Sequence, residues 1–312
     1  MGQVHVAVLG TPDIRHAGEL VVLPTRKALA LLVYVVVEGG VHARDKLADL
    51  FWPASAREAQ SRAALRYTLS CLRAALRHGD GSSHLTEGKA VGFDFNTADE
   101  QDYDLRDFQV LAGPLQPGET RPAFVARLQQ ATALWRGEFL EGFSVRDAPE
   151  FDAWYTHQAE GWHGRLLSVL DRLSQAQADE GQVAEACETT DRWVTLSPLE
   201  ERAYQRRIQL ALASGDRVAA QRAYDACRGI LQRELGMAPA PETEALAHRA
   251  DASPFAHRLK PVRAPLSEAA LTQLHGPLVG RAAEFAHLVE AYHIAHAGRP
   301  KSALVQGGGR YW

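Results

Sequence analysis

The chain has 312 residues, of which 46% are hydrophobic and 23% are charged, and its formal net charge is −4. This length allows two or three domains, and the composition is typical of a globular protein. No apolar run reaches the roughly 18 residues that span a bilayer, and the N-terminus lacks the basic segment of a signal peptide, so we expect a cytoplasmic protein rather than a membrane or secreted one.

Charge is distributed unevenly along the chain. Residues 1–97 carry 11 Lys or Arg against 9 Asp or Glu, whereas residues 98–252 carry 16 against 26 and residues 253–312 carry 7 against 3. Within Arg57–Arg77 there are five arginines and one acid, Glu58. Such a locally basic element favours contact with nucleic acid, while the acidic middle of the chain favours contact with protein.

The first part of the chain is predicted to be a small α+β unit. Thr25 is a suitable N-cap for a helix, and Gly39 with Gly40 is a suitable end for it. We expect the elements in this order: strand Val4–Leu9, strand Glu19–Leu23, helix Arg26–Glu38, short strand Val41–His42 and helix Arg44–Phe51.

The next stretch, residues 52–77, predicts one amphipathic helix behind a Trp-Pro turn. Leucines at helical spacing form a stripe for burial: Leu65, Leu69, Leu72 and Leu76. Arginines form a flank about a quarter-turn away: Arg62, Arg66, Arg73 and Arg77. Periodicity alone favours a solvated surface helix, so the neighbouring elements decide whether this helix has a further role.

Those neighbours predict a helix-turn-helix followed by a β-hairpin wing. Two β segments, His84–Glu87 and Ala90–Phe95, flank Gly88-Lys89, which is a hairpin signal. The long helix is then the one that docks in the major groove of DNA. Candidates for base-edge contacts are Arg62, Arg66, Tyr67 and Ser70. Candidates for phosphate contacts are Arg57, Arg73, Arg77 and Lys89.

From Asp102 onward the pattern is almost entirely helical. Long helices are predicted at Ala123–Arg136 and Glu150–Ala178. Gly181 and Gly215 lie 34 residues apart, a period typical of tetratricopeptide-like helix pairs. The tryptophans of this part are interpreted as core residues: Trp135, Trp154, Trp162 and Trp193.

Two groups of segments resemble a known family. TRKALALLVYVVVEGG, RDKLADLFW and SRAALRYTLSCLRAAL resemble the OmpR-like winged-helix domain of the Streptomyces antibiotic regulatory protein (SARP) family, over roughly residues 3–96. LWRGEFLEGF, LSPLEERAY and LQRELGMAPAPETEAL resemble the bacterial transcriptional activator domain that follows it in this family, over about residues 98–250. The family's wing usually ends in a Gly-Tyr-Arg-Leu-type strand, whereas this chain reads Lys89-Ala90-Val91-Gly92-Phe93, so the resemblance supports the helix contacts more than the wing contacts.

The resemblance implies a transcriptional activator that binds direct repeats of double-stranded DNA as a pair of copies. It also implies that the Phe51–Ala56 turn faces RNA polymerase. Because the first strand begins at Val4, no receiver domain is expected before the winged helix. No cofactor, metal or catalytic activity is expected, since neither the three cysteines nor the histidines have ligand or triad spacing.

We therefore predict a mostly α chain, with an N-terminal winged helix-turn-helix followed by an all-α, TPR-like repeat domain. The expected domains are the winged helix at 1–97, the activator domain at 98–252, a linker at 253–275 and the truncated start of an AAA- or STAND-like ATPase domain at 276–312. GPLVGRAAE in the last segment resembles an ATPase entry, but the P-loop Lys and Ser/Thr are missing from the sequence.

Three other classes of function remain open. A TPR-type interaction scaffold would use the repeat domain and would show negligible, salt-insensitive DNA binding. An ATP-dependent switch conflicts with the missing P-loop lysine. An enzyme is the least favoured, because His157, His163 and His293 form no recognisable ligand set or triad.

Overall fold

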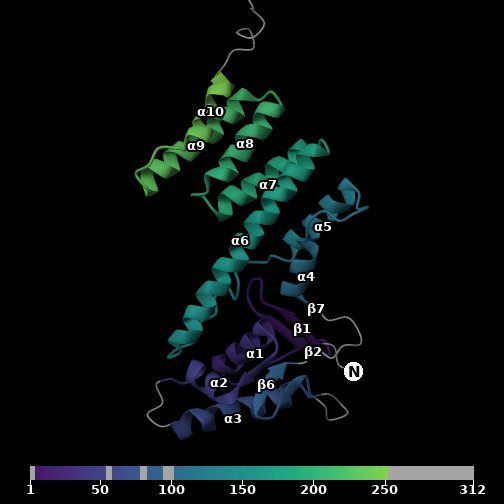
Figure 1. Cartoon of the computed structure of the whole chain (residues 1–312), viewed down its shortest axis with the longest axis vertical. Helices are drawn as coiled ribbons and strands as arrows, with labels where there is room; N and C mark the ends of the chain where they lie inside the picture. Colours follow the sequence, from purple (N-terminus) through teal and green to yellow (C-terminus); the bar gives the residue numbers. More distant parts are fainter. Residues whose placement is uncertain (1–3, 54–57, 78–82, 94–101, 252–312) are drawn as a thin grey trace, which may run out of the picture. The chain divides into compact units, whose positions relative to one another are not determined.

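The computed structural model describes residues 4–53, 58–77, 83–93 and 102–251. All of them belong to one compact unit, Met1–Ala252. The linker and ATPase entry expected at 253–312 lie outside the described residues. The predicted fold class is confirmed: small sheets with a winged helix-turn-helix come first, and a helical domain follows (Figure 1).

The first sheet contains two strands that the sequence did not predict. One, β2, comes from the N-terminal segment, and the other, β7, comes from much later in the chain. Its order is β3 (Glu19–Leu20), β2 (Asp13–His16), β1 (Val4–Ala7) and β7 (Asp102–Tyr103). β1 runs antiparallel to β2 and parallel to β7. The predicted strand Glu19–Leu23 is wrong in length, and β2 was missed because Ile14 is its one buried residue, so it shows no clear alternation.

The helix-turn-helix follows with the predicted caps. α1 (Arg26–Glu38) begins at Thr25, whose Oγ1 accepts a hydrogen bond from the Ala28 N–H at 3.1 Å, and ends at Gly39 with φ +64°. The remaining elements of this part are β4 (Val41–Ala43), α2 (Arg44–Phe51), α3 (Glu58–Ala75), β5 (Leu85–Glu87) and β6 (Ala90–Phe93). The second sheet has the order β4-β6-β5 and is antiparallel throughout, as expected for a wing.

The rest of the described chain consists of seven helices. They are α4 (Asp104–Leu111), α5 (Arg121–Ala133), α6 (Pro149–Asp179), α7 (Val183–Leu196), α8 (Glu201–Ala213), α9 (Arg217–Glu234) and α10 (Pro241–Asp251). Successive helices from α6 to α10 pack side by side as TPR-like pairs (Figure 1). Ala186 and Ala220, 34 residues apart, are both fully buried and allow their helices to approach closely.

Glycines make the turns inside the repeats. Gly181 and Gly215 have φ of +77° and +79°. In the second turn the Asp216 N–H donates to the Ala211 carbonyl at 2.8 Å, and in the first the Gln182 N–H donates to the Gln177 carbonyl at the same distance. Both are Schellman ends, whose left-handed residue is usually glycine.

This geometry predicts opposite outcomes for two identical substitutions. Gly215→Ala is expected to destabilise the protein by about 1 kcal/mol, because an L residue is strained at positive φ. Gly229→Ala, inside α9 with open space around its Cα, is expected to stabilise it by about 0.5–1 kcal/mol. Urea unfolding of both variants measures the difference, and two changes of the same sign would contradict this account.

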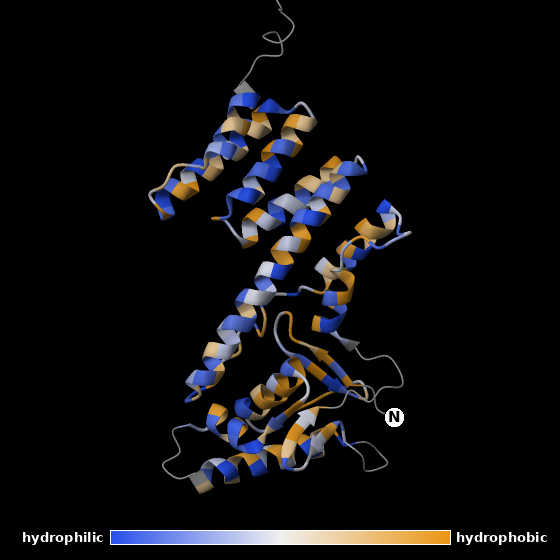
Figure 2. Cartoon of the chain, viewed as in Figure 1, coloured by the Kyte–Doolittle hydropathy of each residue, from blue (hydrophilic) through white to orange (hydrophobic). Residues whose placement is uncertain are grey.

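One hydrophobic core continues from the first sheet into the helical domain. It contains Val6, Leu69, Leu166 and Trp193, and so extends from β1 to α7. Figure 2 shows hydrophobic and hydrophilic residues interleaved along the helices. Among the described residues, none of the helices combines the length and the apolar character needed to cross a bilayer.

Polar contacts join the same two parts. The Asp104 Oδ2 accepts hydrogen bonds from the Val8 and Leu9 N–H groups at 2.6 and 2.7 Å, while its side chain is 5% exposed. The Trp154 Nε1–H donates to the Glu38 carboxylate at 2.7 Å. Trp135, Trp162 and Trp193 are buried as predicted, and Trp154 is half-buried and packs against the same core.

Candidate nucleic-acid interface

The helix α3 is fixed by its leucines. All members of the predicted stripe are at most 1% exposed: Leu65, Leu69, Leu72 and Leu76. Ser61 Oγ also donates to the Trp52 carbonyl at 3.0 Å, which ties the first turn of α3 to the end of α2. The sequence pattern gave no signal for this bond. With its core face fixed, α3 presents one defined face to solvent.

Most of the candidate residues lie on that outer face. Each candidate that the structure describes is exposed: Arg62, Arg66, Tyr67, Ser70 and Arg73 on α3, Arg77 just after it, and Lys89 in the β5–β6 turn. At about 100° per residue, Arg62, Arg66 and Arg73 lie within about 40° of one another around the helix axis. Arg57 and most of the Phe51–Ala56 turn lie outside the described residues. The face combines cationic side chains with small or aromatic neighbours, which suits a groove of DNA.

The arginines of this face differ in their partners. Arg62 Nε donates to the Asp45 carboxylate of α2 at 2.9 Å, so part of its function is to hold the two helices together. Arg66 has no hydrogen bond or ion pair with any residue that the structure describes. Its five N–H donors are therefore not used by any residue that the structure describes.

Tyr67 is 63% exposed and lies one turn before Cys71 on the same helix. A hydrogen bond with the Cys71 side chain raises the pKa of Tyr67 above its usual value. The phenol therefore stays protonated at neutral pH and keeps its O–H as a donor. With Ser70, it adds neutral hydrogen-bonding groups beside the arginines.

The wing is held against the start of α2. Arg44 Nε donates to the Gly88 carbonyl at 3.0 Å, and Lys89 is the exposed residue at the tip of the hairpin. Gly92 is required in β6, since a Cβ there would lie 2.7 Å from the Gly40 carbonyl oxygen. Arg44 was not among the predicted site residues, because its contact joins positions 44 residues apart and leaves no local pattern.

The interface has the parts of a winged helix: α2, α3 and the β5–β6 hairpin. Within the part of the chain that the structure describes, no group of three or more His, Cys, Asp or Glu side chains is placed to hold a metal ion. The geometry offers a basic face on α3 and an exposed lysine in the hairpin turn, and a hydrogen bond to α2 holds each of these two elements.

Comparisons with known proteins agree with this architecture. The family described as the bacterial transcriptional activator domain matches residues 103–250. The structure is similar to that of Mycobacterium tuberculosis EmbR in complex with a low affinity phosphopeptide, with a TM-score of 0.64 and 19% sequence identity, over 93% of this chain and 72% of that chain. No curated protein sequence matches the chain. The structural likeness concerns the fold, and the family match concerns the helical part.

Proposed function

We propose that this chain is a transcriptional regulator of the SARP type, in which a winged helix precedes a bacterial transcriptional activator domain. We also propose that it binds double-stranded DNA sequence-specifically through α3. The observation that carries this proposal is the outer face of α3, where Arg66 is exposed and has no partner among the described residues. A transcriptional regulator acts on the chromosome, so we place the protein in the cytoplasm.

The residues of this face take different roles in the proposal. Base edges are read by Arg66, Tyr67 and Ser70, and by Arg62 once it has released Asp45. Phosphates are contacted by Arg57, Arg73, Arg77 and Lys89, which position the protein on the duplex without reading sequence. Phosphate contacts also make binding fall steeply as the salt concentration rises.

The assembly on DNA is a further part of the proposal. Direct repeats would be bound by two copies of the chain, and the turn after α2 would contact RNA polymerase to activate transcription. Support for these steps comes from the family alone. The helical domain, with its acidic balance of 16 Lys or Arg to 26 Asp or Glu over residues 98–252, suits contacts with protein rather than DNA.

Selection of bound fragments from random-sequence DNA tests the proposal. The native protein is expected to enrich a short direct repeat. Arg66→Ala is expected to weaken binding to that repeat by about 5- to 150-fold and to relax the preference at one base pair, because a bidentate Arg–guanine contact contributes about 1–3 kcal/mol of discrimination. Lys89→Ala should weaken all sequences alike and lower the slope of log affinity against log salt by about 1.

Arg222→Ala is the matched control. Arg222 is an exposed arginine of α9, far along the chain from α3, and its loss should leave DNA binding unchanged. If no sequence is enriched and binding is weak for every fragment at low salt, the α3 face does not read DNA. Function would then have to be sought in the repeat domain as an interaction scaffold.

A further inference from the structure

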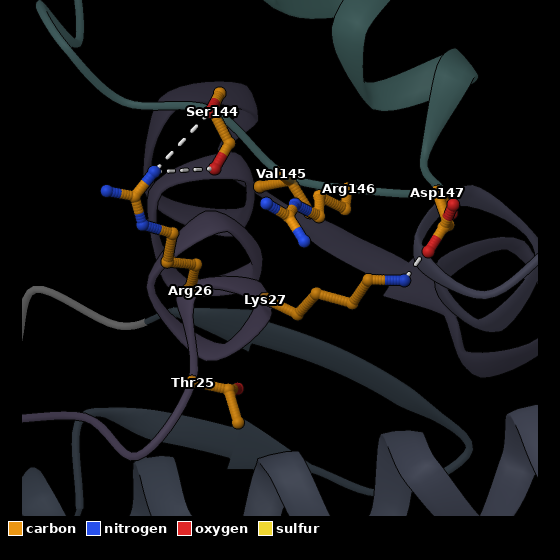
Figure 3. A pocket seen from close by; sticks show the side chains of 7 residues that line it. All are labelled: Thr25, Arg26, Lys27, Ser144, Val145, Arg146 and Asp147. Atoms are coloured by element: carbon orange, nitrogen blue, oxygen red, sulfur yellow. Dashed lines mark hydrogen bonds between the residues drawn. The ribbon is translucent and has the colours of Figure 1, made fainter.

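An open cavity, lined mainly by charged and polar residues, lies where the start of α1 meets the segment that leads into α6. Its volume is about 560 Å³, within the range of small-molecule sites. The lining residues are Thr25, Arg26, Lys27, Ser144, Val145, Arg146 and Asp147. Figure 3 shows Arg26 and Lys27 extending from α1 toward the segment that carries Arg146 and Asp147. The winged helix and the activator domain therefore both contribute side chains to this cavity.

The cavity carries more positive than negative charge. Three of its side chains are cationic and one, Asp147, is anionic. The Arg26 guanidinium donates to the Ser144 carbonyl and hydroxyl oxygens at 3.3 and 3.4 Å, which are neutral acceptors. Arg146 has no hydrogen bond or ion pair with any described residue. The first turn of α1 contains no acidic residue that would balance this charge.

Lys27 connects the cavity to the helix-turn-helix. Its ammonium donates to the carbonyl of Phe51, the last residue of α2, at 2.6 Å and to the Asp147 carbonyl at 3.4 Å. Burial lowers the pKa of Lys27, and the Asp147 carboxylate opposes that effect. Burial disfavours the positive charge of Lys27, and an anion bound beside its ammonium would offset that cost, as the Asp147 carboxylate already does in part.

We propose that this cavity binds a small phosphate monoester, with Arg146 and Arg26 as the groups that hold the phosphate. Guanidinium groups match the oxygen geometry of a phosphate, and two of them from different elements can bind it together. The cavity volume leaves room for the organic part of such a ligand. Because Lys27 also contacts the Phe51 carbonyl at the end of α2, the cavity adjoins the helix-turn-helix. This proposal builds on the function proposed above but is tested without DNA.

Calorimetric titration of the full chain is the test. The probes are inorganic phosphate, AMP as a phosphate monoester, and adenosine as the same molecule without the phosphate. We expect saturable binding of AMP, weaker binding of phosphate and none of adenosine. Arg146→Ala should weaken AMP binding about tenfold or more, since a charge-assisted hydrogen bond contributes that much. Arg222→Ala should bind AMP as the native chain does.

Two results would overturn the site. One is the absence of saturable binding for both phosphate and AMP. The other is equal AMP affinity in the native chain and in Arg146→Ala, which would indicate a different location. Because the titration contains no DNA, a negative titration would not contradict DNA binding through α3. A negative DNA selection would likewise not contradict phosphate binding in the cavity.

Discussion

Asp104→Ala is expected to lower the free energy of unfolding by about 2–5 kcal/mol, because it leaves buried N–H groups without an acceptor. Asp104 Oδ2 accepts from both Val8 and Leu9, which are fully buried. Asp104→Asn can keep both bonds through its single amide oxygen. We therefore expect the asparagine variant to lose clearly less stability than the alanine variant in urea unfolding at pH 7.

The same pair of variants has a pH signature. Burial raises the pKa of Asp104 to about 6, despite three backbone hydrogen bonds (from Leu9, Val8 and Leu105) and the nearby Arg136 guanidinium, which lower it. Between pH about 4 and 6 the folded state then holds a proton that the unfolded state has released. The native protein should lose stability relative to Asp104→Asn as pH rises through this window, by up to about 3 kcal/mol. If the free energy of unfolding depended on pH in the same way for the two proteins, the raised pKa of Asp104 would be contradicted.

Leu69→Ala should destabilise the protein by about 2–5 kcal/mol. Leu69 is 1% exposed in the middle of α3, where a truncated side chain leaves a cavity that its neighbours only partly fill. Ser70→Ala is the control, since Ser70 follows it on the same helix but is exposed and should change stability by less than about 0.5 kcal/mol.

Chemical denaturation of both α3 variants separates the two faces of this helix. The alanine at position 69 should shift the urea midpoint strongly, and the alanine at position 70 should leave it nearly unchanged. Equal shifts would show that α3 is not held by its leucine stripe. The Ser70 variant remains suitable for DNA selection because its fold is preserved.

Helices whose periodicity and caps agree were predictable from the sequence. Arg26–Glu38 and Arg44–Phe51 have the observed bounds, because Thr25 and Gly39 are strong local signals at the ends of the first and the apolar positions define the second. The exposed arginines of α3 followed from the buried leucines by the geometry of one helix. These features depend on residues within a few turns of each other, which is the range over which a sequence pattern is informative.

Features that depend on distant residues could not be predicted in this way. The pairing of Arg62 with Asp45 and of Arg44 with Gly88 requires the tertiary arrangement of α2, α3 and the wing. Trp154 has the helical spacing of a core residue, but its ring lies at the junction of two parts and its N–H bonds to Glu38. A periodic pattern identifies the inner face of a helix, but it does not identify the residues against which that face packs.

The pairing of β7 with β1 has a consequence for dividing the chain into fragments. β1 is flanked on one side by β2 and on the other by Asp102–Tyr103, which belongs to the segment that begins the helical domain. A recombinant fragment ending at residue 97 would lack that partner strand and would leave one edge of the sheet open to intermolecular pairing and aggregation. A fragment with a complete first sheet therefore has to extend past β7, so a cut at residue 97 does not separate two intact parts.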